Sequence, residues 1–228
     1  MLPDTPSRRL AAELSLLASP VLALLFVALS PPFPDDPVDR LAGFADGWAP
    51  TVSATAFTVM QLPMLVAFLA IGRLLLPGAR RLSAWGTALA VVGCFGHVVF
   101  GGLSMAYLVM AHDEANRATY AGLMADVESS PVMVFAVAGL LGTVLGELLL
   151  SIGLFRTRTG PRWVGPAVWA FLVLEFGLSA VSPLASYLAV LLLGAAFWAL
   201  ALEIRARSHV DGGRQPVGEH LGVGGQRA

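Results

Sequence analysis

Six long apolar stretches alternate with short polar segments along the chain. Each stretch is long enough to cross the roughly 30 Å hydrocarbon core of a bilayer as a helix that rises about 1.5 Å per residue. Backbone groups in lipid must be hydrogen-bonded within their own segment, so only helices fit stretches of this length. We predict an all-α, polytopic transmembrane helix bundle over residues 1–207. Its six spans are expected near residues 10–29, 52–72, 83–110, 132–155, 163–181 and 184–202.

The arginines predict the orientation of the bundle. All but Arg40 and Arg117 of the 14 basic residues precede the first stretch, follow the sixth, or lie between stretches two and three or four and five. Six spans place these four regions on one side, and the positive-inside rule makes that side cytoplasmic. The other side is acidic, with Asp35, Asp36, Asp39, Asp46, Asp113, Glu114, Asp126 and Glu128. We therefore predict a multi-pass protein of a bacterial plasma membrane with both termini in the cytoplasm.

The first apolar stretch has an alternative interpretation. Ser7-Arg8-Arg9 before an apolar run resembles a secretory or twin-arginine signal, and Ala28-Leu29-Ser30 would serve as its cleavage site. The run contains Pro20 and is followed by five more apolar stretches, which favours a first helix that is retained.

The two longer outer loops and the C-terminal segment also carry patterns. Apolar residues recur at near-helical spacing in residues 35–48 and 113–130, which predicts short amphipathic helices on the outer surface. From Ser208 onward the chain is rich in glycine and polar residues. This composition predicts a disordered cytoplasmic tail over residues 208–228.

Composition supports the membrane assignment and excludes several partners. Hydrophobic residues make up 57% of the chain and charged residues only 13%, so the apolar excess must face the lipid bilayer. The net charge of −1 offers no basic surface, and we expect no nucleic-acid partner. The single cysteine, Cys94, excludes an intramolecular disulfide and a cysteine metal cluster.

Motifs for phosphate binding, zinc hydrolysis, serine hydrolysis and dithiol chemistry are all missing from the sequence. We therefore expect no cofactor, and the sequence leans away from an enzyme. His97 and His112 are too far apart along the chain to form a helix-face ligand pair, and we expect no metal site.

Four polar residues inside the spans are the candidate functional site: Gln61, His97, Glu147 and Glu175. A carboxylate near the bilayer centre costs a few kcal/mol, so we expect both glutamates to face the bundle interior in a largely neutral form. One interpretation is structural, with these groups hydrogen-bonding neighbouring helices. The other is a buried site for proton coupling, cation binding or acid–base chemistry. The sequence leaves open whether the four residues share one cavity.

A close-packing motif lies beside one of these glutamates. Gly142-x-x-x-Gly146 directly precedes Glu147, and small residues at this spacing allow two helix backbones to approach closely. We expect the motif to serve packing within the bundle. A homodimer through this face is the less favoured use.

One segment resembles a known family. Gly153-Leu154-Phe155-Arg156 is followed by Pro161-Arg162-Trp163-Val164-Gly165. This pattern is similar to the junction between spans four and five in a bacterial family of six-span integral membrane proteins classed as a domain of unknown function. The resemblance implies the six-span architecture over about residues 8–205. It implies no activity and no catalytic residues.

Three classes of function stay open. The first is a protein that handles a small molecule or ion through a polar intramembrane site. The second is an accessory or structural membrane component, for which both glutamates should be capped in a tightly packed bundle. The third is an intramembrane enzyme acting on a lipid or isoprenoid, with Glu147 or Glu175 as general acid in an elongated apolar pocket.

Overall fold

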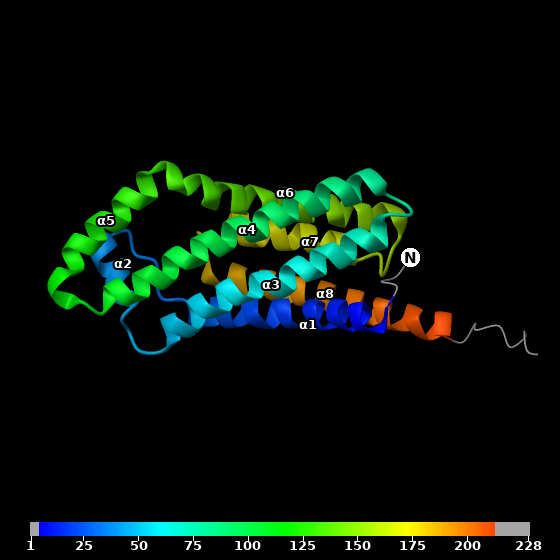
Figure 1. Cartoon of the computed structure of the whole chain (residues 1–228), viewed down its shortest axis with the longest axis horizontal. Coiled ribbons are helices and arrows are strands. Elements are labelled where there is room, and N and C mark those ends of the chain that lie inside the picture. Colours follow the sequence, from blue (N-terminus) through cyan, green and yellow to red (C-terminus); the bar gives the residue numbers. More distant parts are fainter. Residues whose placement is uncertain (1–4, 213–228) are drawn as a thin grey trace, which may run out of the picture.

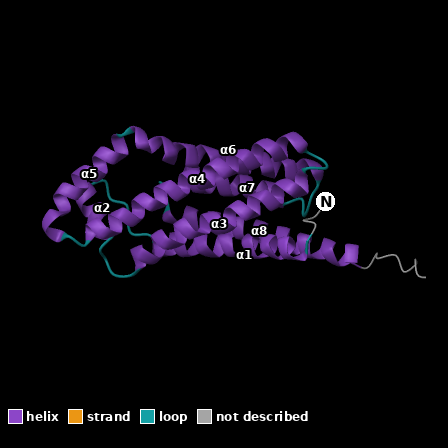
Figure 2. Cartoon of the chain, in the orientation of Figure 1, coloured by secondary structure: helices purple, strands orange, loops and turns teal. Residues whose placement is uncertain are grey.

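The computed structural model describes residues 5–212, and in that range every regular element is helical (Figure 2). The helices form an elongated bundle with most of their axes running along its length (Figure 1). The prediction of an all-α bundle is confirmed.

Five helices of the described residues are long and apolar enough to cross a membrane by length and composition. They are α1 (Pro6–Leu29), α3 (Ala49–Leu75), α4 (Arg80–Ala111), α6 (Val134–Thr157) and α8 (Pro183–Gly212). The short 3-10 turn η2 (Pro131–Met133) precedes α6. Large apolar side chains such as Leu62, Val109 and Leu191 lie exposed on the outside of these helices. An apolar outer surface of this extent is what a lipid-facing bundle presents, and it is compatible with an integral membrane protein.

The fifth apolar stretch forms a shorter helix than the sequence predicts. The α-helix α7 (Val164–Val173) passes into a π-helical turn, η3 (Leu174–Leu178), instead of continuing to residue 181. The chain then turns before Pro183, where α8 begins, because a residue that precedes proline is biased away from the helical conformation. The structure therefore has five long apolar helices and one shorter one, Val164–Leu178, where the sequence predicts six spans.

Short helices cap one end of the bundle, on the left in Figure 1. They are α2 (Pro37–Gly43), the 3-10 turn η1 (Glu114–Asn116) and α5 (Arg117–Ser129). The Asp36 carboxylate caps α2 by accepting hydrogen bonds from the backbone N–H groups of Val38 and Asp39. Leu41 and Met124 are fully buried in a small apolar core beneath this cap. The prediction of a helix in each longer loop is confirmed.

The opposite end of the bundle carries the start of α1 and the far end of α8 (Figure 1). Helix α8 continues to Gly212, so residues 208–212 are helical where the sequence predicts the start of a disordered tail. The rest of that predicted tail, residues 213–228, lies outside the described residues.

Helices α4 and α6 approach each other through glycines. A Cβ atom added at Gly142 would lie 2.6 Å from the backbone nitrogen of Gly93, and one added at Gly146 would lie 2.6 Å from that of Ala90. Both distances are far below van der Waals contact, so only glycine permits this approach. The structure thus places Gly142 and Gly146 at a contact within the bundle.

The junction between α6 and α7 is a tight, specifically bonded turn. Arg158 ends α6 in the left-handed conformation, with φ of 54°, and its N–H donates to the carbonyl of Leu154. Further along, the indole N–H of Trp169 donates to the hydroxyl of Ser151 over 2.9 Å. A Cβ atom at Gly165 would lie 3.0 Å from the Ser151 carbonyl oxygen, so α7 also lies directly against α6.

Candidate functional site

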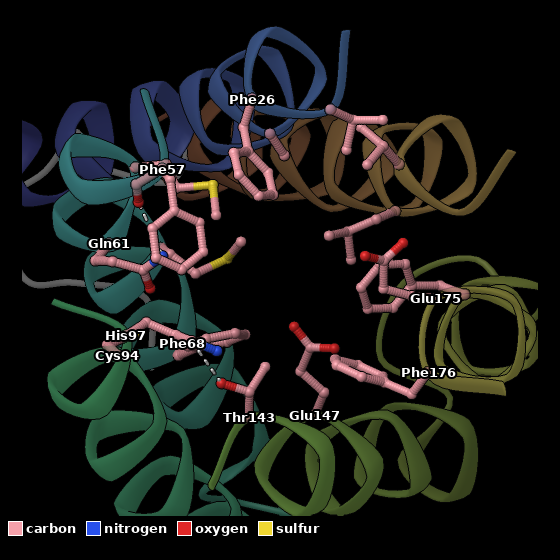
Figure 3. A pocket seen from close by; sticks show the side chains of 17 residues that line it. Phe26, Phe57, Gln61, Phe68, Cys94, His97, Thr143, Glu147, Glu175 and Phe176 are labelled. Carbon is pink, nitrogen blue, oxygen red and sulfur yellow. Dashed lines mark hydrogen bonds between the residues drawn. The ribbon is translucent and has the colours of Figure 1, made fainter. Parts of the chain in front are cut away.

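A cavity of about 130 Å³ lies inside the bundle, and all four polar residues singled out in the sequence line it. Gln61 comes from α3, His97 from α4, Glu147 from α6 and Glu175 from η3. Figure 3 shows these side chains around the cavity, with Glu147 and Glu175 on neighbouring parts of the wall. The structure therefore brings together residues that are far apart along the chain.

Helical spacing places the other residues of the wall on the same faces. Residues three or four positions apart share one face of a helix. Gln61 on α3 is accordingly joined by Phe57, Met64 and Phe68. On the other helices the same spacing adds these wall residues: Cys94 beside His97, Thr143 beside Glu147, and Phe171 beside Glu175.

Gln61 and His97 both have hydrogen-bond partners on the wall or in the backbone beside it. The Gln61 amide donates from Nε2 to the backbone carbonyl of Phe57 over 3.1 Å. His97 Nδ1 and the Thr143 hydroxyl lie 3.3 Å apart and link α4 to α6. The Phe57 ring also stands edge-on to the His97 ring, with 5.6 Å between the ring centroids. Hydrogen bonds and ring contacts therefore hold the side of the wall formed by α3 and α4 in place.

The carboxyl groups of Glu147 and Glu175, unlike the side chains of Gln61 and His97, each keep a buried oxygen without a hydrogen-bond partner. Glu147 is only 3% exposed, and its Oε2 atom is buried without a hydrogen-bond partner among the described residues. The Oε2 atom of Glu175 is likewise buried and unpartnered, although Ser186 hydrogen-bonds to the same carboxyl group. A buried polar atom without a partner costs about 1–3 kcal/mol, and few native groups are left in this state. Two such oxygens on one cavity are groups that a ligand with hydrogen-bond donors would satisfy.

The π-helical turn positions Glu175. A π turn holds one residue more than an α turn, and such turns occur frequently at functional sites. Here it lies where the apolar helix α7 ends, and the hydroxyl of Ser179 donates to the backbone carbonyl of Glu175. The turn therefore widens the helix at the residue whose carboxyl group lines the cavity.

Sequence reasoning missed the aromatic part of the wall and Thr143. Five phenylalanines contribute to it: Phe26, Phe57, Phe68, Phe171 and Phe176. In an apolar span, a phenylalanine that faces a cavity and one that faces lipid look alike in the sequence. Spacing from the polar residues is the one available signal, since Thr143 precedes Glu147 by one helical turn and Phe57 precedes Gln61 likewise.

We call the first cavity the inner cavity. A second cavity of about 240 Å³ lies between it and the cap formed by α2 and α5. We call it the outer chamber. An ion pair of 2.9 Å between Arg40 on α2 and Glu128 on α5 lies in its wall, and Arg40 also stacks over the Phe33 ring at 4.6 Å. Phe26 and Phe57 line both cavities, and their ring centroids are 4.9 Å apart. These two rings form the partition between the chambers.

The polar cluster at the end of α4 is a structural turn. His112 Nδ1 lies 2.7 Å from the Leu108 carbonyl oxygen. Hydrogen bonds, first from the side chain of Asn116 and also from the Tyr120 hydroxyl, hold the pKa of Asp113 below its usual value. Over residues 5–212, no three histidine, cysteine, aspartate or glutamate side chains are grouped so that they could hold a metal ion.

The fold and the cavity together are compatible with one class, namely multi-pass helical membrane proteins with a mostly apolar pocket that holds a few polar side chains. Comparisons with protein-family models, with curated proteins and with solved structures find no match for this chain. The resemblance to a six-span family therefore stays a prediction from the sequence.

Proposed function

We propose that this chain is a six-span protein of a bacterial plasma membrane, with both termini in the cytoplasm, that handles a small molecule or ion through the inner cavity. The placement of the arginine-bearing segments supports the orientation, because the start of α1 and the far end of α8 lie at one end of the bundle and the acidic short helices α2 and α5 lie at the other (Figure 1). The similarity to the six-span family at the α6–α7 junction is part of this proposal.

Two further contacts support the span count. Helix α7 and its π turn pack against both α6 and α8, so the short apolar helix takes the place of the predicted fifth span. Helix α1 is packed against α3 and α8, with Leu16 and Ser19 fully buried. Phe26 of α1 also lines both cavities, so a retained first helix, and not a cleaved signal peptide, completes the site.

The unpartnered Oε2 atom of Glu147 is the observation that carries the function. A purely structural role requires that both glutamates be capped by neighbouring groups in a tightly packed bundle. Instead, an oxygen on each glutamate is buried without a partner on the wall of one cavity. The low dielectric of the bundle makes such an oxygen a strong acceptor for any donor or cation that reaches it.

The size of the cavity favours a small ligand over a lipid. An apolar cavity of roughly 150 Å³ holds one molecule of benzene. The inner cavity, at about 130 Å³, has a similar capacity and is much smaller than a whole acyl or isoprenoid chain. This favours the binding of a small molecule or ion over chemistry on a lipid.

The experiment uses the single cysteine as a built-in reporter of unfolding. Cys94 is 4% exposed, so a thiol-reactive fluorogenic dye should label it fully only when the detergent-solubilised protein unfolds. The unfolding temperature is measured with sodium, potassium, small amines, small alcohols and small carboxylates. At least one compound should stabilise the wild type but not Glu147→Gln, because glutamine keeps the shape of the neutral acid and removes the ionisable group.

Glu13→Gln is the matched control, since Glu13 lies on α1 and lines neither cavity. It should respond as the wild type does. If every compound shifts the wild type and Glu147→Gln equally, the carboxyl group of Glu147 is not part of a ligand site and the proposal fails.

A further inference from the structure

The hydrogen-bonding groups of the inner cavity favour a ligand that donates hydrogen bonds. The described wall holds two carboxyl groups and no arginine. The Oε2 atoms of Glu147 and Glu175 are both buried without partners, and a carboxyl group that is ionised opposite a cation only accepts hydrogen bonds. In Figure 3 the two carboxyl groups approach the cavity from α6 and from η3, so one ligand can contact both. A protonated primary amine carries three N–H donors and one positive charge, which matches two acceptor oxygens and an acidic wall.

The aromatic and thioether side chains of the wall also favour a positively charged ligand. Five phenylalanine rings line the cavity, and the face of an aromatic ring attracts a cation within about 6 Å of its centroid. Met60 and Met64 add polarisable apolar surface. An acidic group surrounded by aromatic and thioether side chains is a setting for an organic cation, because the carbon atoms of the ligand are buried along with its charge.

An inorganic cation fits this wall less well. Hard cations such as Ca²⁺ take about six to eight oxygen ligands, and Mg²⁺ about six. The described wall offers few oxygens apart from the two carboxyl groups, namely the Thr143 hydroxyl and the Gln61 amide. No group of three metal-binding side chains occurs over residues 5–212. A volume of about 130 Å³ leaves room for an alkyl or single-ring group beside the charged nitrogen.

We propose that the inner cavity binds small protonated primary amines, with Glu147 as the charge partner and Glu175 as the second hydrogen-bond acceptor. This rests on the proposed function, since it names the class of ligand that the same cavity takes. The ammonium group lies between the two carboxyl oxygens, and the carbon chain lies against the phenylalanine rings.

Cys94 provides a direct test because it lines the same cavity. Aminoethyl methanethiosulfonate and methyl methanethiosulfonate are small thiol reagents. Only the aminoethyl reagent carries a protonated primary amine. In both reactions the Cys94 thiol loses its proton to solvent, its sulfur forms a disulfide bond with the reagent, and methanesulfinate leaves. The rate of each reaction on the folded protein is followed by mass spectrometry, and the ratio of the aminoethyl rate to the methyl rate is the measured quantity. Taking the ratio cancels any change in the reactivity of the thiol itself.

We expect this ratio to be at least about tenfold higher in the wild type than in Glu147→Gln, which corresponds to about 1.4 kcal/mol. Glu175→Gln should lower the ratio by a smaller factor, and Glu13→Gln should leave it unchanged. n-Butylamine should slow the modification of Cys94 in the wild type more than 1-butanol does, because the two differ mainly in the ammonium group.

Equal ratios in the wild type and in Glu147→Gln would overturn the assignment of amines and leave the proposed function standing. Protection by sodium or potassium but not by n-butylamine would also overturn it, in favour of an inorganic ion. If neither reagent modifies Cys94 in the folded wild type, the cavity is closed to small molecules, and both proposals fail.

Discussion

Replacing Gly142 by alanine tests whether the glycine contact between α4 and α6 positions the cavity. The added Cβ atom would lie 2.6 Å from the backbone nitrogen of Gly93 and 2.7 Å from the carbonyl oxygen of Leu89. Ordinary van der Waals contact begins at 3.4 Å, so the two helices must separate by about 1 Å. Backbone atoms, unlike the end of a flexible side chain, cannot move aside without moving the helix.

The magnitude follows from two opposing terms. Forcing a methyl group into a well-packed contact costs about 1–3 kcal/mol. Alanine also recovers up to about 1 kcal/mol of helix propensity relative to glycine. We expect Gly142→Ala to lower the free energy of unfolding by about 1–2 kcal/mol. The displacement should also lengthen the 3.3 Å contact between Thr143 and His97, since Thr143 follows Gly142 on α6.

The assay is unfolding of the purified protein by a titration of sodium dodecyl sulfate, followed by labelling of Cys94. Gly102→Ala is the matched control on α4, because a Cβ atom at Gly102 would meet no atom within 4 Å. That variant should keep or gain stability. If Gly142→Ala proves as stable as Gly102→Ala, the close approach of α4 and α6 is not as the structure has it.

Three further predictions concern the cap, its pH dependence and the orientation. Glu128→Gln should lower the free energy of unfolding by about 1–3 kcal/mol, because Arg40 is 8% exposed and loses its charged partner. Asp39→Asn, on the exposed face of α2, is the control and should have little effect in the same unfolding titration. The pKa of Asp113 is lowered in the folded protein, chiefly by the hydrogen bond from the Asn116 side chain. The ionised Asp113 carboxylate therefore stabilises η1 at pH values above the ordinary aspartate pKa of about 3.9. This stabilisation is lost as the pH falls through the lowered pKa. The protection of the η1 amides against exchange, taken relative to the intrinsic exchange rate at each pH, should therefore fall at acidic pH in the wild type, and an Asp113→Asn variant that shows the same fall would refute this. In a Cys94→Ser background on intact cells, a cysteine at position 45 should react with an impermeant thiol reagent and one at position 208 should not, and the reverse labelling would refute the cytoplasmic placement of both termini.

Much of the fold could be predicted because it depends on local pattern. The apolar stretches predicted the long helices within a few residues, except that α8 continues to Gly212 beyond the predicted end at residue 202. The spacing of apolar residues in the outer loops predicted helices where α2 and α5 lie. The π turn at Glu175 could not be predicted. The turn packs against α8 while α7 before it packs against α6 and α8, and the sequence of this stretch is as apolar as that of its neighbours.

The four polar residues of the candidate site could be named from the sequence, but the sequence could not predict that they line one cavity. Gln61, His97, Glu147 and Glu175 were singled out because polar groups are costly in lipid. Depth along each span follows from residue counts, whereas the rotation of each helix about its axis is set by contacts such as that of Gly142 with Gly93. Only the structure supplies those rotations, and with them the cavity and its phenylalanine rings.

The partition formed by Phe26 and Phe57 has a kinetic consequence. These two rings line both chambers and lie 4.9 Å apart, so rotation of the two side chains can change the separation between the chambers. Ring rotamers change far faster than helices shift, on time scales that begin at picoseconds to nanoseconds for exposed groups, against microseconds to milliseconds for domain motions. Rotation about χ1 of the two phenylalanines is then a motion that alters the partition without a shift of the helices. Helix positions and amide protection can stay constant while it occurs.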